Sequence, residues 1–157
     1  MSSTIHPLSP EEIVVRLALA ALFGLVLGLD RELRGMAAGI RTHALVCISS
    51  AAITVSAVMM AADAHEARGQ DLDPLRVIQG LAQAIGFIAA GLIFVHRQDV
   101  HNLTSAANIW LATAVGIAAG AGQTFLAAVA VGFGVIVVTL VRVVERWIPG
   151  SSKERKD

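Results

Sequence analysis

The residues in this sequence that could do chemistry gather in two polar clusters, and the first follows a long apolar run. It contains Asp30, Arg31 and Glu32, and the same connection closes with Arg41 and Thr42. These side chains could form a charged, hydrogen-bonded site, or Asp30 and Glu32 could offer oxygen ligands to a cation such as Mg²⁺. A solvated loop with ordinary flanking charges is the alternative, and the residues are equally consistent with it.

The second cluster lies at the start of another apolar run and contains Thr104, Asn108 and Trp110. Thr104 and Asn108 are four residues apart and share one helix face. An amide about one turn into a membrane helix needs a partner, because unsatisfied polar groups are costly in hydrocarbon. Hydrogen bonding between helices is therefore one interpretation, while Thr104 or Ser105 could simply cap the helix and Trp110 could pack or anchor at the interface.

The surrounding sequence is that of a membrane protein. The chain has 157 residues, of which 55% are hydrophobic and 15% are charged, against about 25% charged residues in soluble domains. Five apolar stretches have nearly the roughly 20 residues that a helix needs to cross a bilayer. We predict an all-α, polytopic bundle of five transmembrane helices at about 11–29, 43–62, 75–95, 104–121 and 124–146.

One membrane domain accounts for most of the chain. It extends over 1–148, and a short polar tail at 149–157 follows it, with no soluble C-terminal domain expected. Ser9 should cap the first helix, with Pro10 at its first position and Glu12 completing a capping box. Asp73 followed by Pro74 should start the third helix.

Several function classes conflict with the composition. Lysine plus arginine and aspartate plus glutamate both number 12, and aromatic residues make up 4% of the chain, so nothing favours nucleic-acid binding. Cys47 is the single cysteine, which excludes a disulfide within the chain and a multi-cysteine zinc site. No nucleophile and base fall at catalytic spacing, so we do not expect an enzyme.

The positive charges predict an orientation. Nine lysines and arginines fall in connections on one side of the predicted bundle and two on the other. Because basic loops stay in the cytoplasm, the N-terminus should lie outside and the C-terminus inside. Arg16 falls within the first helix, where it could snorkel to the interface or pair with an acidic group.

Small residues recur at four-residue spacing along three of the predicted helices: Gly24 and Gly28; Ala82, Gly86 and Ala90; Gly116 and Gly120. Such stripes let helix backbones approach closely in lipid. They fit tight packing within one bundle, and one of them could instead form the interface of a homo-oligomer. The first four helices could also be a weak repeat of two hairpins whose polar turns meet at the cytoplasmic side, with generic hairpin topology as the alternative.

The two clusters, taken in order, resemble the MgtC/SapB family of bacterial inner-membrane proteins. Gly-Leu-Asp-Arg-Glu and Ala-Gly-Ile-Arg-Thr-His-Ala-Leu-Val within 28–46, a glycine- and alanine-rich element at 84–93, and Leu-Thr-Ser-Ala-Ala-Asn-Ile-Trp within 103–116 carry the resemblance. The chain departs from the family pattern at Asn102, where glycine is usual, at Ser105 and Asn108, where threonine is frequent, and at Ala84 and Ala89, where glycine is frequent.

The resemblance implies a five-helix inner-membrane domain with a non-enzymatic, regulatory role in adaptation to magnesium limitation or stress. It implies action through contacts with other membrane proteins, including the ATP synthase. The alternative is a channel or carrier for Mg²⁺ or another small ion. Arg31 and Arg41 beside Asp30 and Glu32 would repel a cation, which disfavours a conducting pore.

Overall fold

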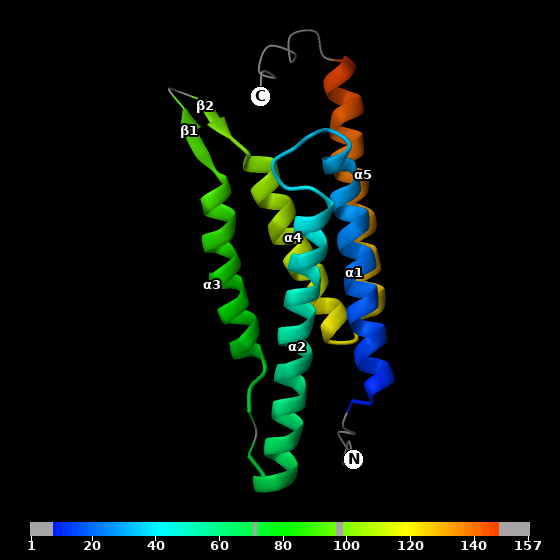
Figure 1. Ribbon diagram of the computed structural model, residues 1–157, viewed down its shortest axis with the longest axis vertical. Helices are drawn as coiled ribbons and strands as arrows, with labels where there is room; N and C mark the ends of the chain where they lie inside the picture. The colour runs from blue at the N-terminus through cyan, green and yellow to red at the C-terminus, as the bar shows by residue number, and fades with distance from the viewer. Residues whose placement is uncertain (1–7, 71, 97–98, 148–157) are drawn as a thin grey trace.

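A computed structural model describes residues 8–70, 72–96 and 99–147 of the chain (Figure 1). All five helices among these residues are long and apolar enough to cross a membrane, which confirms the predicted all-α, five-helix membrane protein. The elements in chain order are α1 (Pro10–Glu32), α2 (Ile40–Arg68), α3 (Leu75–Leu92), β1 (Phe94–His96), β2 (Asp99–His101), α4 (Leu103–Gly120) and α5 (Thr124–Trp147).

The bounds of α2 and the turn between α3 and α4 differ from the sequence-based expectation. α2 begins three residues earlier and ends six residues later than the predicted 43–62, and Gly69 closes it in the left-handed conformation at φ 60°. The turn between α3 and α4 is an antiparallel hairpin of two three-residue strands, in which Val95 is paired with Val100. The predicted tail at 149–157 lies outside the described residues.

The helix starts follow local capping chemistry. The Ser9 hydroxyl accepts a hydrogen bond from the Glu12 amide at 3.2 Å, and the Glu12 carboxylate accepts one from the Ser9 amide at 2.9 Å. This confirms the predicted capping box, which supplies partners to amides that the helix leaves unpaired. At the start of α3, the Asp73 carboxylate accepts a hydrogen bond from the Leu75 amide at 2.9 Å.

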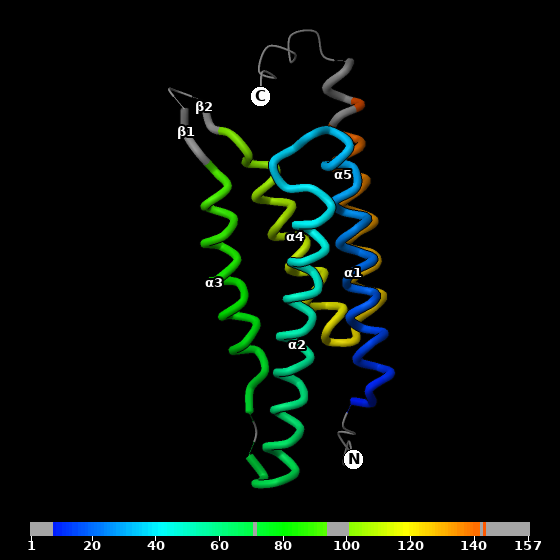
Figure 2. Tube along the Cα trace, in the orientation of Figure 1, coloured from blue at the N-terminus to red at the C-terminus, as the bar shows by residue number. Residues whose placement is uncertain are grey.

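The bundle is built around α4, of whose 18 residues eleven are buried. α1, α2, α3 and α5 all pack against it. α3 stands to one side of the other helices and buries only Ile85 and Ala89 (Figures 1 and 2). α1 ends, α2 begins, α3 ends and α4 begins at the same end of the bundle, which we call the polar end and define by residues 30–43 and 102–108.

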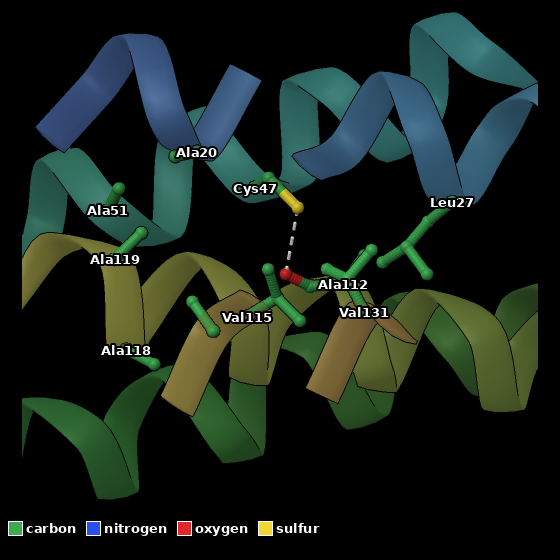
Figure 3. Packing of buried hydrophobic residues seen from close by; sticks show 10 residues of the cluster. Ala20, Leu27, Cys47, Ala51, Ala112, Val115, Ala118, Ala119 and Val131 are labelled. Atoms are coloured by element: carbon green, nitrogen blue, oxygen red, sulfur yellow. Dashed lines mark hydrogen bonds between the residues drawn. The ribbon is translucent and has the colours of Figure 1, made fainter. Parts of the chain in front are cut away.

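Glycines set the distances between the central helices. A Cβ atom on Gly24 or Gly28 would lie within 3 Å of the α2 backbone, and one on Gly116 or Gly120 would also collide with α2. Two of the three small-residue stripes therefore pack inside the bundle. The core between these contacts consists mainly of small residues, and Figure 3 shows Cys47 within it, its thiol 3.0 Å from the carbonyl oxygen of Ala112.

Arg16 contacts the end of a neighbouring helix, and no ion pair with an acidic group is found for it among the described residues. Its guanidinium donates a hydrogen bond to the carbonyl oxygen of Gly120 at 2.8 Å, at the C-terminus of α4. The last carbonyls of a helix have no partner within the helix and carry partial negative charge, so a cation is favourable there. Arg16 thus closes the end of α4 from a neighbouring helix.

Replacing a glycine with alanine should affect the free energy of unfolding in opposite directions at a packed and at an open position. Gly116→Ala should lower the free energy of unfolding by about 1–3 kcal/mol, because the added methyl group overpacks the contact with α2. Gly132→Ala is the matched control, since its Cβ would meet nothing within 4 Å and alanine favours a helix by about 1 kcal/mol. Denaturation by sodium dodecyl sulfate in mixed micelles, followed by circular dichroism, measures both. Equal stability of the two variants would contradict the close contact between Gly116 and α2.

Candidate functional site

The centre of the polar end is a buried arginine. Arg31 lies in the last turn of α1 and is 2% exposed. Its guanidinium donates a hydrogen bond through Nη2 to the hydroxyl oxygen of Ser105, which is fully buried in the first turn of α4. Because a charged donor strengthens a hydrogen bond and burial removes competing water, this contact ties the first helical hairpin to the second.

Glu32 joins the end of α1 to the start of α2. Its carboxylate accepts a hydrogen bond from the amide of Ile40 at 3.0 Å. α2 has no side-chain cap of its own, because Gly39 precedes it. A Cβ atom on Gly39 would collide with the Glu32 carboxylate, so glycine makes room for this contact. An acidic group at a helix N-terminus also interacts favourably with the helix dipole.

Asp30 lies beside a cavity between α1, α4 and α5. Its Oδ1 accepts a salt bridge from Arg34 Nη2 at 2.6 Å. The cavity has a volume of about 260 Å³ and is lined mostly by apolar residues of α1 and α5, with Asp30, Asn108 and Thr139 as its polar members. A mostly apolar pocket with a few converging polar groups is the usual form of a small-molecule site.

The other predicted site residues lie outside this buried network. Arg41 and Thr104 are exposed, and Thr42 is half-buried. Trp110 is 49% exposed and faces Gly86 of α3, whose Cβ would lie 4.0 Å from its ring. The sequence suggested hydrogen bonding between helices through Thr104, but the hydroxyl that accepts the hydrogen bond from Arg31 is that of Ser105. Neighbouring helical residues project about 100° apart, so one of the pair faces inward and the other outward.

His43 is a buried member of the polar end that the sequence analysis did not single out. The side chain is fully buried, and its Nδ1 lies 2.8 Å from the carbonyl oxygen of Gly39. Its Nε2 and the Nε of Arg31 are buried without a hydrogen-bond partner among the described residues. The signal for His43 was its spacing from Cys47 and Ser50, which puts all three on the buried face of α2.

The geometry of the polar end offers little to a metal ion. One oxygen of Asp30 already binds Arg34, and one of Glu32 binds the amide of Ile40. Within the described ranges, no group of three or more histidine, cysteine, aspartate or glutamate residues could hold a metal. Mg²⁺ prefers six oxygen ligands in octahedral geometry. The arrangement instead suits a set of hydrogen bonds that holds the helices together.

Five spanning helices with a polar end of this kind define an α-helical, polytopic membrane protein. The model of the MgtC family matches residues 17–147, and the chain therefore belongs to the MgtC family. This membership confirms the resemblance found in the sequence, and with the five apolar helices it supports a bacterial multi-pass membrane protein. No solved structure matches the chain at a significant level.

The chain is similar to several curated proteins, which carry different names. An uncharacterized protein of Haemophilus influenzae is 32% identical over 152 residues, covering 94% of this chain and 64% of its own length. The "Putative magnesium transporter YhiD" of Escherichia coli is 38% identical, over 71% of this chain and 52% of its own length. Protein MgtC of Brucella abortus is 36% identical, over 80% of this chain and 50% of its own length. The chain thus spans about half to two thirds of these relatives.

The contact between Arg31 and Ser105 can be tested against its neighbour in the sequence. Ser105→Ala should lower the free energy of unfolding by about 1–3 kcal/mol, because it leaves a buried cationic donor without its acceptor. Thr104→Ala is the matched control and should stay within about 0.5 kcal/mol of wild type, since Thr104 is exposed. Denaturation by sodium dodecyl sulfate in mixed micelles measures the stability of both variants. A larger loss for Thr104→Ala would refute the assignment of Ser105 as the partner.

Proposed function

We propose that this protein is a non-enzymatic membrane regulator that acts through contacts with other membrane proteins during magnesium limitation or stress. The observation that carries the proposal is that the charged groups at the polar end bind other parts of the same chain. Arg31 binds Ser105, Glu32 binds the start of α2, and Asp30 binds Arg34. Such a site can hold helices in one arrangement, and it leaves few oxygen atoms for an ion.

The middle of the bundle supports the same proposal. Between the polar end and the opposite end, most of the buried residues are apolar. The buried hydroxyls of Thr54 and Thr113 donate hydrogen bonds to carbonyl oxygens of their own helices. Four glycines bring α1 and α4 into direct contact with the α2 backbone. An ion path needs a continuous series of polar groups or water across the membrane. A close-packed apolar centre works against such a path through one chain.

The partners that we propose are the bilayer, a second copy of the chain, and other membrane proteins, with the ATP synthase among them as the family resemblance implies. The relatives extend beyond the matched region, so any activity that depends on their remaining length is not attributed to this chain. We propose a functional role for seven residues of the polar end and for one residue just beyond it: Asp30, Arg31, Glu32, Arg41, Thr42, Thr104 and Asn108, together with Trp110.

The second candidate function is transport of Mg²⁺ or another small ion. Two observations favour it: the name of the Escherichia coli relative, and the cavity beside Asp30 and Asn108. Asp30 and Glu32 would be the ion ligands in that case. The cavity is lined on most sides by apolar residues, however, and such a surface does not replace the hydration shell of a divalent ion.

Ion flux separates the two candidates. Liposomes containing the purified protein and a magnesium-sensitive dye should take up Mg²⁺ no faster than protein-free liposomes. In cells, Asp30→Asn and Arg41→Ala should each reduce growth at limiting magnesium while folded protein accumulates normally. Uptake that rises with protein density and disappears in Asp30→Asn would instead establish transport. Full growth of both variants would reject a functional role for the two residues.

The orientation can be tested with fused reporters. We propose that the polar end faces the cytoplasm, because the connections on this side carry nine lysines and arginines against two on the other. Green fluorescent protein fused after Asp157 should therefore fluoresce, and alkaline phosphatase at the same position should be inactive. Alkaline phosphatase fused after Gly69 is the matched control and should be active. The reverse pattern would contradict the orientation.

A further inference from the structure

One helix presents polar side chains to the lipid. Gln83 is the ninth of the 18 residues of α3, and it is exposed, as is Gln79 one turn earlier. Neither amide makes a side-chain hydrogen bond among the described residues. A helix of 18 residues is about 27 Å long, so Gln83 lies near the middle of the hydrocarbon, beyond the reach of headgroups and water.

An amide at that depth needs a protein partner. Lipid tails offer neither donor nor acceptor, and unsatisfied polar groups in hydrocarbon are costly. The glutamine side chain is too short to reach the interface from the centre of the helix. Glutamine side chains therefore join transmembrane helices by hydrogen bonds between them, and the missing partner of Gln83 must come from outside this chain.

We propose that the outward face of α3 is the interface with a second copy of this chain, held by amide-to-amide hydrogen bonds between the Gln83 side chains and between the Gln79 side chains. This inference rests on the proposed homo-oligomer and identifies its surface. Residues at helical spacing form the face, all of them exposed: Arg76, Gly80, Gln83 and Phe87. Ile85 and Ala89, the buried residues of α3, lie on the opposite side.

A second copy fits this face better than an unrelated helix. A primary amide is both donor and acceptor, so two identical glutamines on a two-fold axis satisfy each other. Asp73 and Arg76 are both exposed at the outer end of α3. In a parallel pair, Arg76 of each copy can approach Asp73 of the other, so the charges are self-complementary as well.

The small residues support the same surface. A Cβ atom on Gly80 would meet nothing within 4 Å, whereas one on Gly24, Gly28, Gly116 or Gly120 would collide with a neighbouring helix. The internal stripes are thus occupied by packing within the chain, while Gly80 leaves a position where a second α3 backbone can approach closely. α3 also buries only two of its residues, Ile85 and Ala89, inside the bundle.

Cysteine cross-linking in native membranes tests the surface. Arg76→Cys and Gln83→Cys should each form a disulfide-linked dimer when a membrane-permeant oxidant is added. Ile88→Cys, on the flank of the same helix, and Phe133→Cys, on α5, are equally lipid-exposed controls and should remain monomeric. The native Cys47 is fully buried, so the wild-type chain measures the background.

The role of the amides has its own measurement. In liposomes of phosphatidylethanolamine and phosphatidylglycerol, energy transfer between labelled chains gives the dimer fraction as lipid is added. Gln83→Leu should weaken dimerisation at least threefold, since an interhelical hydrogen bond contributes about 0.6 kcal/mol in a membrane. Gln83→Asn keeps the amide and should retain most of the affinity. Both variants should unfold in micelles as wild type does, because Gln83 lies outside the packed side of α3.

The outcomes are distinguishable. Dimers that cross-link through Phe133→Cys and not through α3 would overturn this interface while leaving the homo-oligomer intact. A chain that stays monomeric at every lipid ratio would overturn both. Cross-linking of Gln83→Cys to a protein of different mass, without dimers, would assign the face to another membrane protein and reject the second copy.

Discussion

The fold depends on how closely α2 approaches α1 and α4. Gly24 and Gly28 bring α1 against the α2 backbone, and Gly116 and Gly120 do the same for α4. Burial of apolar side chains does not drive helices together in lipid, where the surroundings are equally apolar, so van der Waals contact between backbones carries more of the association. With α1 and α4 both held against α2, the positions of their side chains at the polar end are set.

The polar end uses those positions. Arg31 can reach Ser105 because α1 and α4 both pack closely against α2. Glu32 can cap α2 because Gly39 leaves space for its carboxylate. A buried guanidinium is costly unless its donors are satisfied. The hydrogen bond to Ser105 offsets part of that cost, and it makes the geometry of the polar end sensitive to any relative movement of α1 and α4.

Sequence reasoning predicted the features that depend on local pattern and failed where neighbouring helices decide. The five spans follow from apolar length, and the box at Ser9 and Glu12 follows from cap chemistry. The partner of Arg31 did not follow, because Thr104 and Ser105 are similar in chemistry and only the packing of α4 shows which one faces inward. The role of Arg16 likewise required the end of α4 to be in place.

Asn102 departs from the family pattern at a position with a left-handed backbone conformation. Its φ of 64° is left-handed, which glycine adopts freely and asparagine tolerates better than other residues. The glycine usual at this position thus meets a conformational requirement, and asparagine meets it at some cost in strain. Its side chain also donates a hydrogen bond to the carbonyl oxygen of Leu92 at 3.1 Å, which links the two ends of the hairpin between α3 and α4.

α3 differs from the other helices in where its polar side chains find partners. The charged groups at the end of α1 are engaged within the chain, whereas the amides of α3 have no side-chain partner among the described residues. α3 is joined to the rest chiefly through α4, whose first turn also holds Ser105. A contact made on the outer face of α3 is therefore connected through one helix to the buried arginine, which is the arrangement that a membrane protein acting through lateral contacts requires.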